Sequence, residues 1–363
     1  MSLPLTKDTA RRRPLAFLWP LPPVYPWGRL GIGALVVLVI GIVAGGIGAV
    51  FIPPWTLVNI VADRLPGVSV SNDWPDSLET IVWRLRMPRI VLTALVGAAL
   101  GISGATYQGL FRNPLADPYL IGVASGAGLG ATIVLLTAVP LFYVGFSVLP
   151  LAAFVGGMLA VSVAYGIAKR SGGVELTTLI LAGVAIASLA GAVTSLLIIR
   201  ANPDVRPLLG WLFGGFIGAS WNDVLTILPY VIVGSLIMMA YSRILNMLQA
   251  DEHEAKQMGV NVERTKLLLI ATASLTTAAA VSVSGLIGFV GLIAPHAVRL
   301  VWGHDHRSLL PISMLVGAGF LVLADIVART AASPTELPVG VVTAFCGAPF
   351  FLYLLRKRGR AGT

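Results

Sequence analysis

The chain has 363 residues, of which 56% are hydrophobic and only 11% are charged, and its mean hydropathy is +0.88. Soluble domains carry about 25% charged residues, so this composition excludes a soluble protein and predicts a polytopic membrane protein. The net charge of +9 does not indicate nucleic-acid binding, because the basic residues fall in short segments between apolar runs. The single cysteine, Cys346, excludes an intrachain disulfide and a thiolate metal cluster.

The N-terminal segment holds three consecutive arginines, Arg11 to Arg13, and then a proline-rich stretch. The first apolar run starts only near Leu30. A cleaved signal peptide would be shorter and closer to the start of the chain, so we predict that the first span is retained. Residues 1–28 are interpreted as a cytoplasmic tail.

Ten stretches without charge, or nearly without charge, predict ten membrane helices, with nine or eleven as alternatives. A helix needs about 20 residues to cross the hydrocarbon core. The stretch 118–168 has 51 residues without a charge and suits two crossings, with Pro140 and Pro150 near the turn. The predicted spans are 30–51, 90–110, 119–138, 147–168, 177–199, 223–242, 266–284, 287–301, 309–328 and 340–356.

Most lysines and arginines fall in segments on the side of the N-terminus. The positive-inside rule therefore places both termini in the cytoplasm. The segment 52–83 is predicted to be a polar external loop, and 201–221 a short helix at the outer interface, where Trp211 and Trp221 favour that depth. Several arginines remain on the outer side, clustered at helix ends, and they need a separate explanation.

The long polar insertion from Arg243 to Lys266 breaks the membrane pattern on the cytoplasmic side. Asp251 to Met258 are helix formers with acidic residues first and Lys256 later, and Gly259 is placed to end the helix. Two interpretations are open: a solvated connector, or a docking element for a cytoplasmic partner. The apolar residues Leu248, Ala255 and Met258 favour docking.

No catalytic, cofactor or metal site is predicted. The chain has no Gly-x-x-x-x-Gly-Lys-Ser/Thr loop, so it is not expected to hydrolyse ATP. The run His304-Asp305-His306 is interpreted as a solvated turn rather than a metal site. Asp325 and Arg329 are spaced to pair near an outer helix end. A secondary transporter would be expected to bury carboxylates near the midplane, and none is predicted there.

Several ordered strings of the sequence carry a family resemblance. The strings are Arg86 to Arg89, Gly97 to Gly104, Gln108 to Pro118, Gly122 to Gly126, Ser284 to His296, Asp305 to Pro311, Leu323 to Arg329 and Glu336 to Thr343. Together they closely resemble the FecCD-type permeases of ABC importers for iron-siderophores, haem and cobalamin. This resemblance covers roughly residues 80–356, and strings this long and ordered are specific.

The resemblance implies an all-α polytopic membrane protein with the type II ABC importer permease fold, in the bacterial cytoplasmic (inner) membrane. The permease domain would span residues 29–356 with a cytoplasmic coupling segment at 245–264, and 357–363 would be a cytoplasmic tail. It further implies a homodimer, two cytoplasmic ATPase subunits that hydrolyse ATP, and an extracytoplasmic substrate-binding protein. The permease itself would do no covalent chemistry.

The resemblance also implies roles for three sets of residues in this sequence. Arg86, Arg89 and Arg329 would meet acidic residues of the binding protein. Asp251, Glu252, Glu254, Ala255, Met258 and Gly259 would form the coupling helix that seats in the ATPase. Asn113, Leu115, Leu176 and Thr177 would form the cytoplasmic gate. The sequence departs from the family where the usual Leu-Gly-Glu reads Ala250-Asp251-Glu252, and where Met258 stands in place of leucine.

The expected function is ATP-driven alternating access for an iron chelate, either a siderophore or haem. Iron is favoured over cobalamin because iron importers are the commoner members of the family. Cobalamin transport by the same class of importer is the alternative, and an ion-coupled secondary transporter is a more distant one.

Overall fold

The computed structural model describes residues 27–48, 50–64, 66, 74–137, 142–143, 146–170, 173–200 and 205–361. The predicted N-terminal tail lies outside the described residues, except for its last two residues, which begin the first helix. The helices up to the middle of the chain are α1 (Trp27–Gly46), α2 (Pro54–Asp63), α3 (Asp76–Thr80), η2 (Ile81–Arg86), α4 (Met87–Leu110), η3 (Pro118–Ile121), α5 (Val123–Leu136), α6 (Val148–Ala168) and α7 (Leu176–Arg200).

The helices of the second half are α8 (Arg206–Phe213), α9 (Trp221–Ala240), α10 (Ser242–Ala250), α11 (Glu252–Gln257), α12 (Val262–Ser284), α13 (Val290–Trp302), α14 (His306–Thr330) and α15 (Val339–Ala361). The strands are two short antiparallel pairs: β1 (Phe142–Tyr143) with β2 (Phe146–Ser147), and β3 (Lys169–Arg170) with β4 (Gly173–Val174). Within the described part of the chain the protein is therefore built almost entirely of helices, as predicted.

Seven of the described helices are long and apolar enough to cross a membrane, and α5, α13 and the apolar part of α15 are shorter. Together these ten helices match the ten predicted spans. The second is much longer than predicted, because α3, the π-helical turn η2 and α4 form one continuous helix of 35 residues. The prediction that 52–83 is only a loop was therefore wrong: the segment holds α2 and the start of this long helix.

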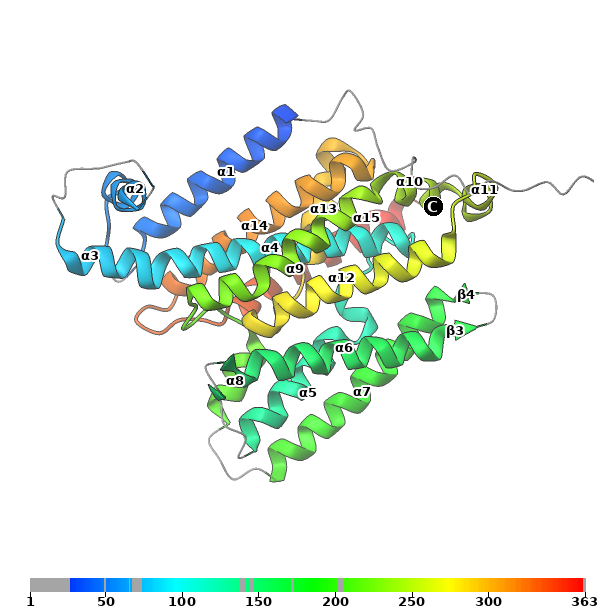
Figure 1. Ribbon diagram of the computed structural model, residues 1–363, viewed down its shortest axis with the longest axis horizontal. Coiled ribbons are helices and arrows are strands. Elements are labelled where there is room, and N and C mark those ends of the chain that lie inside the picture. The colour runs from blue at the N-terminus through cyan, green and yellow to red at the C-terminus, as the bar shows by residue number, and fades with distance from the viewer. Residues whose placement is uncertain are drawn as a thin grey trace, which may run out of the picture.

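The long helices run between two ends of the molecule (Figure 1). α10, α11 and the β3–β4 hairpin lie at one end, and α2 and α3 lie at the other. The helix Asp76–Leu110 is central, since 78% of its most apolar stretch is buried, whereas α1 is peripheral, with 11% buried. Helices α5, α6 and α7 pack together as a separate layer beside α12.

Glycines bring the backbone of α4 against the backbone of α14. A Cβ atom on Gly97 would lie 2.3 Å from the carbonyl oxygen of Gly317, and one on Gly101 would lie 2.3 Å from that of Ser313. No larger residue fits at such separations, and membrane helices use small residues in this way to pack closely. The small residues of the predicted second span therefore face protein.

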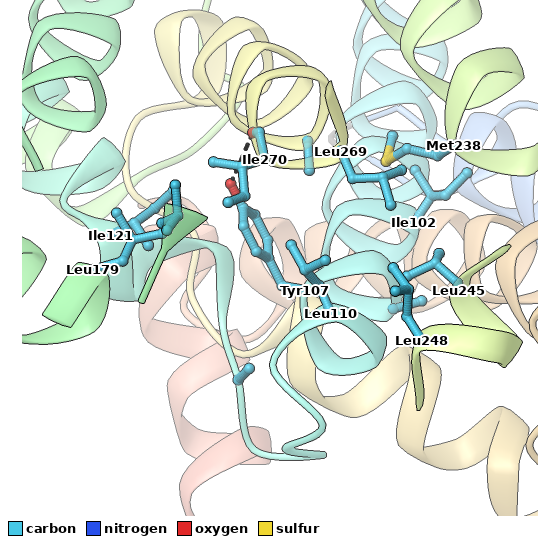
Figure 2. Packing of buried hydrophobic residues seen from close by; sticks show 14 of the residues in the cluster. Ile102, Tyr107, Leu110, Ile121, Leu179, Met238, Leu245, Leu248, Leu269 and Ile270 are labelled. Atoms are coloured by element: carbon cyan, nitrogen blue, oxygen red, sulfur yellow. Dashed lines mark hydrogen bonds between the residues drawn. The ribbon is translucent and has the colours of Figure 1, made fainter. Parts of the chain in front are cut away.

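The main hydrophobic core lies near the end that carries α10 (Figure 2). Tyr107 of α4 is fully buried there, and its hydroxyl donates to the carbonyl oxygen of Ile270 in α12 at 3.2 Å. Leu245 and Leu248 of α10 are buried in the same cluster. The polar insertion is thus anchored to the transmembrane core by its first helix.

Replacing Gly97 with alanine should destabilise the protein, because the added methyl group would collide with the backbone of α14. Overpacking of this kind costs about 1–3 kcal/mol. Thermal unfolding of the purified protein in detergent should show a lower midpoint. The matched control is Gly166→Ala in α6, where nothing lies within 4 Å of the added Cβ. An equal midpoint for the two variants would contradict the close packing of α4 on α14.

Candidate functional site

A network of ion pairs occupies the end of the molecule opposite α10 and α11. Asp325 of α14, only 1% exposed, accepts a hydrogen bond from Nη2 of Arg89 in α4 at 2.8 Å. Arg329, one turn further along α14, places its Nε 3.0 Å from the other carboxylate oxygen of Asp325. Glu336 also accepts from Arg89, at 2.8 and 3.1 Å. The predicted Asp325–Arg329 pair is confirmed, and Arg89 joins it.

Two arginines of this region also bind carbonyl groups at the end of α1 and in the residues that follow it. The guanidinium group of Arg86 donates to the carbonyl oxygens of Gly45 and Val50. Arg329 donates to Ala44 at 3.2 Å and to Ile47 at 3.1 Å. The last carbonyls of a helix have no partner within the helix and carry partial negative charge, so cations stabilise them.

The structure therefore brings the three predicted docking arginines together, and each is engaged within the chain. The side chains of Arg89 and Arg329 are 14% and 10% exposed, whereas Glu336 is 34% exposed. Glu336 is thus the most accessible side chain of the Asp325 network. It lies between α14 and α15, and sequence reasoning did not assign it a role.

The predicted helix of the polar insertion is present as α11. The side chain of Asp251 caps it by accepting the backbone N–H of His253 at 2.6 Å, and Gly259 follows it with φ +85°. Ala255 is 1% exposed, so its side chain packs inward and is not available to a partner. Leu248 is buried too, and of the three apolar residues interpreted as docking contacts only Met258 faces outward, at 64% exposure.

Ion pairs tether α11 to two transmembrane helices. Glu252 lies 2.8 Å from Nζ of Lys266 in α12 and 3.8 Å from Nη2 of Arg112, in the turn after α4. Arg112 also donates from Nε to the carbonyl oxygen of Leu248 at 2.8 Å. Lys266 is 6% exposed, and a buried ammonium of this kind is costly unless it is paired. The role of Lys266 depends on its contact with Glu252 in the folded protein, so no sequence pattern indicated it.

A third connection joins α10 to the start of α14. Nδ2 of Asn246 donates to Asp305 at 2.7 Å, and Oδ1 of Asn246 accepts the backbone N–H of His306 at 2.9 Å. Partial burial opposes ionisation of Asp305, but hydrogen bonds from Arg307 and Asn246 hold its pKa at about 2. The predicted solvated turn was wrong for His306, which is 1% exposed because α10 covers it.

The predicted gate residues lie at the same end as α11. Oδ1 of Asn113 accepts the backbone N–H of Leu115 at 3.0 Å, which gives the turn after α4 its shape. Leu176 begins α7 and packs against the main core cluster, whereas Thr177 is exposed. These contacts place the four residues, and their role as a gate stays a prediction.

The model of the FecCD transport family matches residues 35–357. The chain belongs to the FecCD transport family. This FecCD permease is 50% identical over 317 residues to the cobalamin import system permease of Halobacterium salinarum, covering 87% of this chain and 82% of the relative. It is 40% identical over 292 residues to the hemin transport system permease of Yersinia pestis, covering 78% and 87%.

Its structure is similar to that of a solved inward-facing ABC transporter, assigned provisionally to the metal-chelate type. The TM-score is 0.77 at 32% identity, and the match covers 90% of this chain and 98% of the other. The fold is therefore that of a type II ABC importer permease, as the resemblance implied. A FecCD permease is a multi-pass membrane subunit of an ABC importer, and it functions with a separate ATPase and a substrate-binding protein.

Proposed function

We propose that this FecCD permease forms a homodimer in the cytoplasmic membrane and transports a large metal chelate by ATP-driven alternating access. The observation that carries this proposal is the family match over residues 35–357, together with similarity to a metal-chelate type transporter over nearly its whole length. Its described helices also fit this mechanism, because the buried carboxylate Asp325 is paired with arginines and not positioned as an isolated proton carrier.

For the cargo, we propose cobalamin first and an iron chelate second. The archaeal cobalamin permease is 50% identical to this chain, against 40% for the hemin permease. The sequence alone had favoured an iron chelate on the frequency of such importers. The relatives support both chemistries, and the higher identity favours cobalamin.

For docking of the binding protein, we propose that Arg89 exchanges carboxylate partners. In the free permease Arg89 is shared between buried Asp325 and the more exposed Glu336. A carboxylate on the binding protein can displace Glu336 and take the same face of the guanidinium group. Bidentate pairing of this kind is oriented and charge-assisted. Arg86 and Arg329 are fixed at the end of α1. They would hold this face of the Arg89 guanidinium group in position and add positive potential around it.

For coupling, we propose that the exposed side of α11 seats in the ATPase. This side consists of His253, Glu254, Lys256, Gln257 and Met258. The other predicted coupling residues form and anchor the helix instead. Asp251 caps it and Gly259 ends it. Glu252 ties it to Lys266, and Ala255 packs into the core. The gate would be formed by Asn113, Leu115, Leu176 and Thr177.

If Arg89 exchanges carboxylate partners, substitutions of Glu336 and of Arg89 should change the affinity for the binding protein in opposite directions. Glu336→Gln should increase the affinity for the binding protein up to about fivefold, because it removes an exposed competing ion pair. Arg89→Gln should weaken it about tenfold or more, the cost of a lost charge-assisted hydrogen bond. Affinities would be measured by surface plasmon resonance on permease in nanodiscs. Arg64→Gln, which breaks the Arg64–Glu79 pair at the same end, is the control. Unchanged affinity in both test variants would refute the exchange.

Coupling is tested by changing only exposed residues of α11. The double variant Glu254→Lys, Met258→Asp should lose the ATPase during co-purification, with affinity reduced at least about tenfold, as for interface hot spots. Arg84→Glu, an exposed change at the opposite end, should retain it. The fold of each variant is checked by thermal unfolding. A well-folded double variant that keeps its ATPase at the normal ratio would argue against the assignment of α11.

The cargo is identified by uptake into proteoliposomes that contain the permease, its ATPase and its binding protein. We expect ATP-dependent uptake of radiolabelled cyanocobalamin, competed by unlabelled cobalamin and not by haemin or a ferric siderophore. Uptake of an iron chelate instead would establish the second candidate. Uptake that persists without ATP would reject the ABC importer mechanism in favour of a secondary transporter.

A further inference from the structure

Two of the membrane helices, α5 and α13, are short, and each follows a break in the helical path. Helix α5 has 14 residues and α13 has 13, so each is about 20 Å long, against about 30 Å for the hydrocarbon core. The first break is residues 111–122, after α4, and the second break is residues 285–289, after α12. Because neither short helix can cross the core, both breaks reach into the membrane. Backbone polar groups there need partners within the protein, because lipid supplies none.

One side-chain hydroxyl joins the two breaks. Tyr119 belongs to the short helix η3 in the first break, and its hydroxyl donates to the carbonyl oxygen of Ile287, in the second break, at 3.0 Å. The same hydroxyl oxygen accepts the backbone N–H of Ile287 at 3.2 Å. Both polar groups of an unwound residue are therefore satisfied by a side chain that lies 168 residues away in sequence.

The contacts around the second break hold it in one conformation. Gly285 has φ +66°, and a Cβ atom on it would overlap the carbonyl oxygen of Trp211 in α8. Phe289 ends the break with φ +69°, a rare backbone conformation for a bulky residue. Its ring packs against α15, where a Cβ atom on Gly347 would overlap it. Unfavourable backbone conformations of this kind persist only where the surroundings over-determine them, so the second break is a fixed attachment point for Tyr119.

The first break carries two of the proposed gate residues, and it is ordered by hydrogen bonds of its own. Asn113 shapes its start by accepting the N–H of Leu115, and the carboxylate of Asp117 accepts the N–H of Tyr119 at 2.8 Å. Leu115 also lines a cavity together with Phe289, and the volume of this cavity is only about 10 Å³. Such a space holds one water molecule at most, so the two breaks lie close together there. They thus meet at Tyr119 and again at Leu115.

We propose that Tyr119 is a positioning residue of the cytoplasmic gate. Its hydroxyl fixes the turn that carries Asn113 and Leu115 on the second break. The consequence for transport rests on the gate assignment proposed above for these two residues. Without the hydroxyl, the ring of Tyr119 would still pack, but the turn would be free to move away from Ile287, whose two backbone groups would lose this partner.

The same contact gives α11 a route to the gate. Glu252 of α11 is paired with Lys266 of α12, and α12 leads directly into the second break. A displacement of α11 that moves α12 would therefore move Ile287, and the hydroxyl of Tyr119 would carry this movement to the gate turn. The gate would then follow the helix that faces the ATPase without a direct contact between α11 and Leu115.

Tyr119→Phe tests the proposal, and Tyr107→Phe is its matched control, because each loses one hydroxyl and keeps its ring. The hydroxyl of Tyr107 also donates to a backbone carbonyl, that of Ile270, but it joins two unbroken helices, α4 and α12. Hydrogen–deuterium exchange of both variants in nanodiscs is measured by mass spectrometry. In Tyr119→Phe the amides of 113–122 and 285–289 should exchange about fivefold faster or more, the change expected for one lost hydrogen bond. In Tyr107→Phe these amides should exchange as in the wild type.

A second measurement asks whether the loosened turn affects transport. The variants are reconstituted in proteoliposomes with the ATPase and the binding protein, and the ratio of radiolabelled cyanocobalamin imported to ATP hydrolysed is determined. Tyr119→Phe should lower this ratio about fivefold, because a gate that is not held follows ATP hydrolysis less faithfully. Tyr107→Phe should keep the wild-type ratio, although both variants lower the midpoint of thermal unfolding.

Faster exchange in both breaks of Tyr119→Phe alone, together with the lower ratio, supports the proposal. Faster exchange with an unchanged ratio retains the tie between the breaks and rejects the gate assignment of Asn113 and Leu115, so the two failures are distinguishable. Exchange that is equal in the two variants overturns the proposal. If Tyr119→Phe does not fold, exchange of the wild-type protein at increasing denaturant replaces it: the two breaks should open together, and independent opening overturns the proposal.

Discussion

The contact between the backbones of α4 and α14 is the constraint on which the rest of the structure depends. Gly97 and Gly101 allow the two helices to approach until a Cβ would overlap a carbonyl of α14. In a bilayer no hydrophobic effect drives helices together, so tight packing of small residues supplies the attraction. The geometry of both ends follows from this contact, because α4 and α14 carry Arg89, Asp325 and Arg329 at one end, and the turn after α4 and the start of α14 contact α11 and α10 at the other.

At each end, burial determines which charges are tolerated. Asp325 is almost fully buried and is paired with Arg89 and Arg329, and an isolated carboxylate there would be strongly unfavourable. Lys266 is buried at the other end and is paired with Glu252. In both networks a more exposed carboxylate takes part: Glu336 shares Arg89 with the buried Asp325, and Glu252 pairs with the buried Lys266. The networks can therefore exchange partners at their accessible side without leaving the buried charge alone.

Much of this architecture could be predicted from the sequence, because hydrophobic runs, charged loops and helix caps are local signals. The ten apolar helices, the short helix after Asp251 and its termination at Gly259 were predicted correctly. The extension of the second span back to Asp76 was not, because its polar, proline-flanked start resembles a loop. Likewise, the inward orientation of Ala255 and the burial of His306 depend on helix α10 and its packing. Residues such as Asn246 and Lys266 acquire their roles only through partners distant in sequence.

The tethers of the coupling segment explain how a displacement of α11 could reach the opposite face. Glu252 connects α11 to α4 through Arg112 and to α12 through Lys266, and Asn246 connects α10 to the start of α14. Because α4 and α14 interlock through backbone contact, sliding one past the other would force carbonyl oxygens into glycine Cα atoms. We infer that the pair moves as a unit, by rotation rather than by shear. Its far end carries Arg89 and Asp325, so the same rotation would alter the docking face. Linkage is reciprocal, and hence a binding protein that favours one orientation of this face would favour the matching position of α11.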